Sequence, residues 1–158
     1  MAFLMIEIDE SERDFKRFFW DENPGIDFEN KRLDIFRMTR VLFGVKSSPF
    51  LLAATIKHHL KKYVDIFPDT FNHLNQSLYV DFLCGNVSVQ AALTTCIESK
   101  QILEEASMDL RKWRTNSSEL NQRLKNLNFE VDEHKGSLNT LIASKVLGVG
   151  WNEKSDTF

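Results

Sequence analysis

At 158 residues the chain is long enough for one domain with a sizeable hydrophobic core. Its apolar and charged contents are those of an ordinary globular protein, which argues against a disordered chain. The formal net charge of −3 gives no global electrostatic basis for nucleic-acid binding, although local basic clusters remain compatible with it.

The sequence contains no apolar run as long as a membrane span, and Met1 is not followed by a basic region and an apolar core. We therefore expect a soluble intracellular protein, located in the cytoplasm, with no membrane partner. Cys84 and Cys96 are too few and too isolated for a disulfide scaffold or a zinc site. They are interpreted as half-buried thiols in a reducing compartment.

The first third of the chain predicts strands. Residues 2–8 alternate like a half-buried strand that opens without a polar lead-in, which suggests that further sequence precedes it, and 9–14 form a polar break. The aromatic segment 15–20 and the alternating segment 33–41 are expected to pair as a hairpin, with Pro24-Gly25 in the turn between them.

The period changes to that of a helix at "GVKSSPFLLAATIKHHLKKY" (44–63). Ser48 is expected to cap this helix, with Pro49 in its first turn. One face carries Leu52, Ala53, Ile56 and Leu60, and the C-terminal end carries Lys57, Lys61 and Lys62. The adjacent His58 and His59 point in different directions on a helix, so we interpret them as residues of its surface or flank rather than metal ligands.

The second half alternates loops, strands and helices. Pro68 and its polar neighbours predict a loop, and "SLYVDFLCG" (77–85) predicts two short strands folded on Asp81. Residues 87–108 predict a helix with an apolar stripe. The members of that stripe are Val89, Leu93, Cys96, Ile97 and Leu103.

The segment 109–127 is expected to begin extended and to become helical after Ser117 or Ser118. Residues 132–139 predict a polar loop, and 144–158 predict a strand and a turn. The order of elements indicates an α+β domain with an antiparallel sheet.

Four blocks occur in an order that resembles a known family: "RMTRVLFGVKSSPFLL" (37–52), "SLYVDFLCG" (77–85), "DLRKWRTNS" (109–117) and "KVLGVGWN" (145–152). Together they resemble the reverse transcriptase of BEL/Pao-type LTR retrotransposons, over nearly the whole chain. The resemblance implies that residues 1–158 are a single partial fingers/palm domain, with a palm-like antiparallel sheet packed on helices. It also implies that the thumb and the remainder of a Pol polyprotein, including RNase H and integrase regions, lie outside this sequence.

In that family the second of these blocks reads Tyr-x-Asp-Asp at the polymerase active site. Nucleotide addition uses two divalent ions about 3.5–4 Å apart, and Mg²⁺ is held by carboxylates and substrate phosphates. The resemblance therefore implies that Asp81 is a catalytic residue and a Mg²⁺ ligand, and that Tyr79 contacts nucleotide or template.

This sequence departs from the family at its acids. Within "YVDF" either Phe82 occupies the second acid's place or one Asp is deleted, and a deletion would turn the following strand by one residue onto its other face. The family's third acid would fall upstream of Met1, and Glu7 or Asp9 would lie on the order of 30 Å from its place. We therefore predict an inactive fragment of an RNA-directed DNA polymerase.

The resemblance also implies further positions that bind the primer–template, which is an RNA/DNA partner. The nucleotide and template side consists of Phe43, Gly44, Ser47, Pro49 and Phe50, together with Lys112, which stands among Arg111, Trp113 and Arg114. The primer grip consists of Leu147 and Gly148. The sequence is equally compatible with structural roles: a helix N-cap with packed aromatics, a solvated basic face, and a strand with a Gly bulge.

Two further functions stay open from the sequence. The first is an intact reverse transcriptase whose acids were lost in gene modelling. The second is a non-catalytic module of the same fold that binds nucleic acid or protein.

Overall fold

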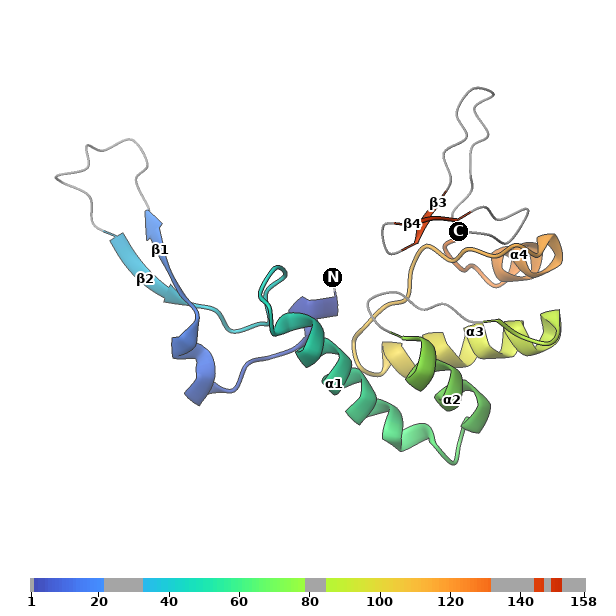
Figure 1. Ribbon diagram of the computed structural model, residues 1–158, viewed down its shortest axis with the longest axis horizontal. Coiled ribbons are helices and arrows are strands. Elements are labelled where there is room, and N and C mark those ends of the chain that lie inside the picture. The colour runs from blue at the N-terminus through green and yellow to red at the C-terminus, as the bar shows by residue number, and fades with distance from the viewer. Residues whose placement is uncertain (1, 22–32, 79–84, 132–143, 147–148, 152–158) are drawn as a thin grey trace, which may run out of the picture. The chain divides into compact units, whose positions relative to one another are not determined.

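The computed structural model describes residues 2–21, 33–78, 85–131, 144–146 and 149–151 (Figure 1). Its secondary structure mixes helices and strands, which confirms the α+β class. The chain divides into two compact units, Met1–Thr55 and Ile56–Phe158, where the sequence predicts one domain. The described strands form two separate antiparallel pairs, β1 with β2 and β3 with β4, instead of one continuous sheet.

The predicted strand over residues 2–8 is wrong for its first half. Ala2–Met5 forms a 3₁₀ helix, and strand pairing is limited to an isolated antiparallel bridge between Glu7 and Arg40. Phe3 is buried, and its ring meets that of Phe43 edge to face, with centroids 5.8 Å apart. Burial of this ring on a distant residue takes precedence over the local alternation.

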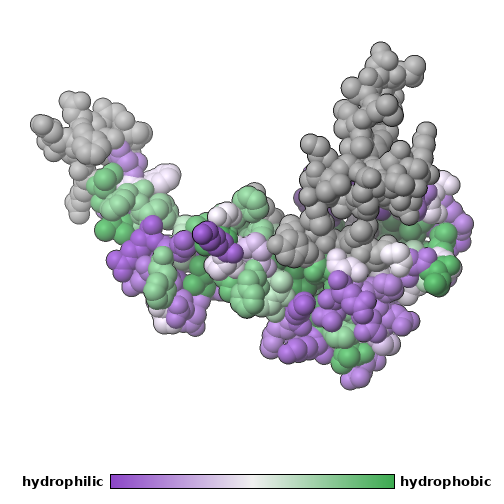
Figure 2. Space-filling model, in the orientation of Figure 1, coloured by the Kyte–Doolittle hydropathy of each residue, from purple (hydrophilic) through white to green (hydrophobic). Residues whose placement is uncertain are grey.

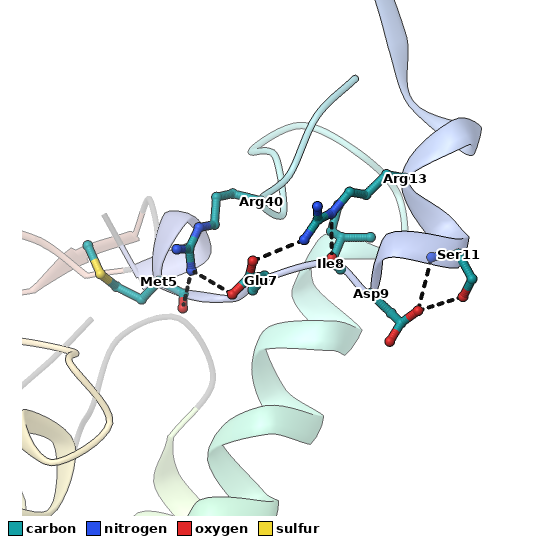
Figure 3. Close-up of polar contacts among 7 residues, drawn as sticks. All are labelled: Met5, Glu7, Ile8, Asp9, Ser11, Arg13 and Arg40. Atoms are coloured by element: carbon teal, nitrogen blue, oxygen red, sulfur yellow. Dashed lines mark hydrogen bonds and ion pairs between the residues drawn. The ribbon is translucent and has the colours of Figure 1, made fainter. Parts of the chain in front are cut away.

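The polar break at 9–14 contains a second 3₁₀ helix, Glu10–Phe15. Asp9 caps it, since one carboxylate oxygen accepts hydrogen bonds from the Ser11 amide at 3.0 Å and from the Ser11 hydroxyl (Figure 3).

The predicted hairpin is confirmed. β1 (Arg17–Asp21) pairs antiparallel with β2 (Leu33–Arg37), with Phe19 opposite Ile35. The predicted turn at Pro24-Gly25 lies outside the described residues.

α1 spans Ser48–Leu60, and the predicted face is confirmed because Leu52, Ile56 and Leu60 are buried. The predicted cap is wrong: the Ser48 hydroxyl donates to the carbonyl of Leu42 instead of accepting from the helix. The Ser47 carbonyl accepts the first helical bond, from the Leu51 amide at 3.0 Å.

The loop predicted around Pro68 is wrong. A short 3₁₀ helix, Lys61–Tyr63, follows α1, and Pro68 then begins α2 (Pro68–Ser77). Proline is compatible with a helix start because its missing N–H has no intrahelical partner there. Burial of Thr70 and Leu74 gives α2 a packed face that local composition did not indicate.

α3 spans Val89–Glu104 and is capped by Ser88, whose hydroxyl accepts from the Ala91 amide at 3.1 Å. Ile97, which was predicted to lie on the apolar stripe, is 42% exposed. The buried face consists of Thr95, Cys96, Ser99, Ile102 and Leu103.

α4 (Ser118–Asn126) begins after Ser117, one of the two predicted starting points, and the Ser117 hydroxyl caps it by accepting from the Leu120 amide at 3.2 Å. Against α3 it forms a hydrophobic cluster of Cys96, Leu120 and Leu124, with Val89, Ala92, Leu93, Trp113, Phe129 and Val131 packed around it. Cys96 is therefore buried, whereas Cys84 lies outside the described residues.

The end of the chain holds β3 (Ser144–Val146) and β4 (Val149–Trp151), an antiparallel pair where the sequence predicts a strand, and the predicted turn lies outside the described residues. The loop predicted at 132–139 lies outside the described residues. Of the helices that the structure describes, none has the length and apolar content needed to cross a membrane.

Candidate nucleic-acid interface

The loop that precedes α1 and the first turn of that helix carry five of the predicted nucleotide and template residues. Phe43 and Phe50 are 78% and 72% exposed. Between them Gly44 has a φ of 86°, a backbone conformation that favours glycine. Ser47 is exposed and Pro49 is half-buried in the first turn of α1.

Backbone contacts fix the shape of this loop. The amide of Ser48 donates to the carbonyl of Val45 at 3.0 Å, and the Ser48 hydroxyl donates to Leu42. Just before the loop, Val41 is buried and its amide donates to the carbonyl of Ile6 at 3.1 Å. The loop is therefore attached at both of its ends.

A polar cluster around Glu7 holds the segment before this loop in place (Figure 3). The Glu7 carboxylate lies 3.0 Å from Arg13 and 4.0 Å from Arg40. Arg13 also donates to the carbonyl of Ile8 at 2.9 Å, and Arg40 donates to the carbonyl of Met5 at 3.5 Å. These contacts join the first residues of the chain to the segment after β2.

The same part of the structure shows how the two acids Glu7 and Asp9 are used. Glu7 is engaged by arginines, and Asp9 caps a 3₁₀ helix. Hydrogen bonds from the Ser11 hydroxyl and amide hold the pKa of Asp9 below its usual value. Both carboxylates therefore have structural partners within the first unit.

The arrangement of this loop suits contact with bases. Exposed aromatic rings provide faces on which unpaired bases stack, and a glycine with an open side lets backbone approach a ligand closely. Among the described residues, apart from the two chain neighbours of Gly44, no atom lies within 4 Å of the position that a Cβ on Gly44 would take. Lys46, which sequence reasoning missed, is exposed within the same loop and adds a cation suited to phosphate.

The second predicted contact region belongs to the other unit. Lys112 is exposed and has a positive φ of 57°. Arg111 is paired with Asp109 at 2.9 Å and lies 3.7 Å from Glu130. Trp113 packs edge to face on Phe129, with centroids 5.2 Å apart.

The indole N–H of Trp113 donates to the carbonyl of Leu110 at 3.1 Å, and the ring belongs to the hydrophobic cluster of α3 and α4. This ring is therefore used in packing, and Lys112 is an exposed cation of the block with no ion pair to any described residue, so it suits a phosphate contact.

Four predicted site residues, Tyr79, Asp81, Leu147 and Gly148, lie outside the described residues. Within the described ranges, no three His, Cys, Asp or Glu side chains are grouped so that they could hold a metal ion. His58 is exposed, whereas His59 is half-buried with its Nε2 2.7 Å from the carbonyl oxygen of Ile102.

A cavity of about 620 Å³ in the second unit was missed by sequence reasoning. The N-terminal turns of α2 and α3 line it, and Gly85, the last residue of the "SLYVDFLCG" block, lies at its wall. Asp69 and Glu98 make part of the wall acidic, and Glu98 accepts a hydrogen bond from the Thr70 hydroxyl. Such a wall favours a hydrogen-bonding ligand over an anion. The sequence did not indicate this cavity, because a loop was predicted around Pro68 where the structure has the start of α2.

Comparisons of the chain with family models, with curated proteins and with solved structures find no match. The resemblance to the BEL/Pao reverse transcriptases therefore rests on the four ordered sequence blocks.

Proposed function

We propose that the chain is part of the reverse transcriptase of a BEL/Pao-type retrotransposon, and that it contacts a primer–template without polymerising DNA. The observation that carries the proposal is the ordered occurrence of four sequence blocks over nearly the whole chain. The exposure of Phe43 and Phe50 in the first block supports it, since aromatic rings on the surface suit base stacking. In this proposal the rest of a Pol polyprotein is the natural partner.

The proposed lack of polymerase activity rests on the acids of the second block. Two-metal phosphoryl transfer requires several carboxylates around the ions, and "YVDF" contains Asp81 alone. Mg²⁺ would be held by Asp81, and no second acid follows it, whether Phe82 occupies that acid's place or one Asp is deleted.

Primer extension tests this absence of activity. Purified chain is incubated with a primed RNA template, all four deoxynucleotides and either Mg²⁺ or Mn²⁺. We expect the same background for the natural chain and for Asp81→Ala. Extension that Asp81→Ala abolishes would refute the proposal. It would favour the intact enzyme, for which genomic sequence across codon 81 is the direct check.

Metal affinity tests the reason for inactivity. Mn²⁺ binding is followed by the relaxation of water protons in the natural chain, in Phe82→Asp and in Asp81→Ala. We expect Phe82→Asp to bind Mn²⁺ more tightly, because two adjacent carboxylates provide more oxygen ligands than one. Equal affinity in all three chains would remove Asp81 from the proposed metal site.

Nucleic-acid affinity tests the loop. Fluorescence anisotropy with a labelled RNA template annealed to a shorter DNA primer measures the dissociation constant. We expect Phe43→Ala and Phe50→Ala each to weaken binding about tenfold, since a base–aromatic stack contributes on the order of 1–3 kcal/mol. Phe15→Ala is the matched control, because Phe15 is 79% exposed in the same unit but outside the block.

The salt dependence of the same binding tests the cations. Lys46→Ala and Lys112→Ala are each expected to reduce the slope of log K against log salt by about 1. Lys57, which is exposed on α1 outside the proposed contacts, is the control position. Slopes that fall equally for Lys57→Ala would indicate diffuse attraction and contradict the interface.

A further inference from the structure

The β1–β2 hairpin carries apolar side chains on both of its faces. Cross-strand pairs share a face, so Phe19 and Ile35, 69% and 60% exposed, lie on one face, and the stacked rings of Phe18 and Phe36 lie on the other. Figure 2 shows hydrophobic residues gathered over this hairpin. A two-stranded ribbon exposed on both faces is only marginally stable by itself, and an exposed apolar surface of this kind marks an interaction site.

One backbone hydrogen bond determines which groups of β1 point away from β2. The Met38 amide donates to the carbonyl of Lys16 at 2.9 Å, just beyond the Arg17–Arg37 pair. Because hydrogen-bonded and non-hydrogen-bonded pairs alternate in an antiparallel ladder, Arg17 and Arg37 form a non-hydrogen-bonded pair. The same alternation directs the backbone N–H and C=O groups of three β1 residues to the outer edge: Arg17, Phe19 and Asp21.

The two ends of the hairpin differ in charge. At one end Arg17 and Arg37 share the carboxylate of Asp14, at 3.0 and 3.2 Å, which leaves an excess of positive charge. At the other end stand Asp34 and Asp21, and Asp21, like Arg17, already has an interaction partner of its own. An antiparallel neighbour of the same sequence would place each end beside the opposite end of its partner, so that opposite charges meet across the edge.

We propose that β1 pairs antiparallel with β1 of a second copy of this chain about a twofold axis at Phe19, forming a four-stranded sheet. In this register Phe19 of each copy forms a hydrogen-bonded pair with its equivalent, with Cα atoms about 5.5 Å apart. Arg17 faces Asp21 of the partner subunit, and Phe18 faces Trp20 of the partner subunit. The outward backbone groups, the aromatic side chains and the charges are all complementary in this one register.

The outer edge of β2 does not bring opposite charges together when it pairs with itself. Self-pairing about Ile35 would place Leu33 opposite Arg37 of the partner subunit and Asp34 opposite Phe36 of the partner subunit. No opposite charges meet in that arrangement, so the charge pattern selects the β1 edge.

A charge exchange in the full chain tests the register. Sedimentation velocity over a range of concentrations measures the dimer dissociation constant. We expect Arg17→Asp and Asp21→Arg each to weaken the dimer about tenfold or more, because each places like charges opposite one another at two symmetric positions. The double variant is expected to restore the dimer, because the pairs are re-formed with their signs exchanged.

Asp34→Arg is the matched control for Asp21→Arg, because Asp34 stands at the same end of the hairpin but on the strand away from the proposed edge and not opposite Arg17. It should leave the dissociation constant unchanged. A natural chain that stays monomeric, a double variant that is not restored, or larger open assemblies in place of a dimer would each overturn the proposal.

Amide hydrogen exchange gives a second, independent readout. In the dimer the Phe19 amide is hydrogen-bonded across the axis, whereas the Phe18 amide already faces β2. We expect protection of the Phe19 amide to fall on dilution and protection of the Phe18 amide to stay constant. Phe19→Pro should abolish dimerisation while retaining the hairpin, since proline removes only an outward-pointing N–H. Concentration-independent exchange at Phe19 would contradict the pairing.

Discussion

The Tyr63 hydroxyl donates a hydrogen bond to Oε2 of Glu105, joining the segment after α1 to the end of α3. Tyr63 is only 5% exposed, and its ring stacks on that of Phe67 with centroids 6.2 Å apart. Burial, followed by the hydrogen bond and charge of Glu105, raises the pKa of Tyr63 from 10.0 to about 12.

This contact predicts a stability change in alkali. Because the pKa of Tyr63 is higher in the folded state, its contribution is fully present below pH 10.0 and is lost as the pH rises to about 12. We expect the natural chain to lose more stability across this window than Tyr63→Phe, which has no proton to release. At neutral pH, Tyr63→Phe should cost about 1 kcal/mol. Urea unfolding at a series of pH values measures both effects, and parallel pH profiles for the two chains would contradict the assignment.

Ser99 predicts a stabilising substitution. Its side chain is fully buried in α3, and its Oγ has no hydrogen-bond partner among the residues that the structure describes. Since an unsatisfied buried hydroxyl costs on the order of 1–3 kcal/mol, Ser99→Ala should raise the free energy of unfolding by about 1 kcal/mol. Ser88→Ala, which removes the cap of the same helix, should lower it by about 1 kcal/mol. Chemical denaturation compares them, and a destabilised Ser99→Ala would reveal an important contact of this hydroxyl.

The hydrophobic cluster of α3 and α4 predicts that the stability of the fold depends strongly on Leu124. This side chain is 1% exposed in the cluster, so Leu124→Ala should lower the free energy of unfolding by about 2–5 kcal/mol. Leu127 stands at the C-terminal end of the same helix and is 47% exposed. Leu127→Ala should therefore change stability by less than about 0.5 kcal/mol. Thermal melting followed by circular dichroism compares the stabilities of the two variants. Equal losses of stability would show that Leu124 does not belong to the core.

At Gly44 we expect a side chain to lower stability through the backbone conformation alone. The glycine's φ of 86° disfavours any side chain, although no atom of a described residue beyond its chain neighbours stands within 4 Å of a Cβ there. Gly44→Ala should therefore lower stability by about 1–2 kcal/mol. Gly85 has equally open surroundings without a positive φ, so Gly85→Ala should have an effect below about 0.5 kcal/mol. Urea midpoints of the two variants test the difference, and equal midpoints would show that the backbone at Gly44 adapts to a side chain at little cost.

The candidate site could be predicted from the sequence only in part. Short-range signals located the helix that follows the loop, because an amphipathic repeat is encoded within a few residues, whereas the contact roles of Phe43, Gly44, Ser47, Pro49 and Phe50 rest on the family resemblance and stay predictions. The use of Trp113 in the core could not be predicted, because its packing partner Phe129 lies on a later segment. The roles of Tyr79, Asp81, Leu147 and Gly148 stay predictions.

Local pattern alone determined the β1–β2 hairpin, the buried face of α1 and the start of α4 after Ser117, since alternation, a repeat of three to four residues and a Ser before a helix are short-range signals. The tertiary structure alone decided that residues 2–5 form a 3₁₀ helix with Phe3 buried, that Pro68 begins a helix, and that Ile97 is exposed. The physical reason is that these outcomes depend on which distant surface each segment buries, and that information is held by residues far away along the chain.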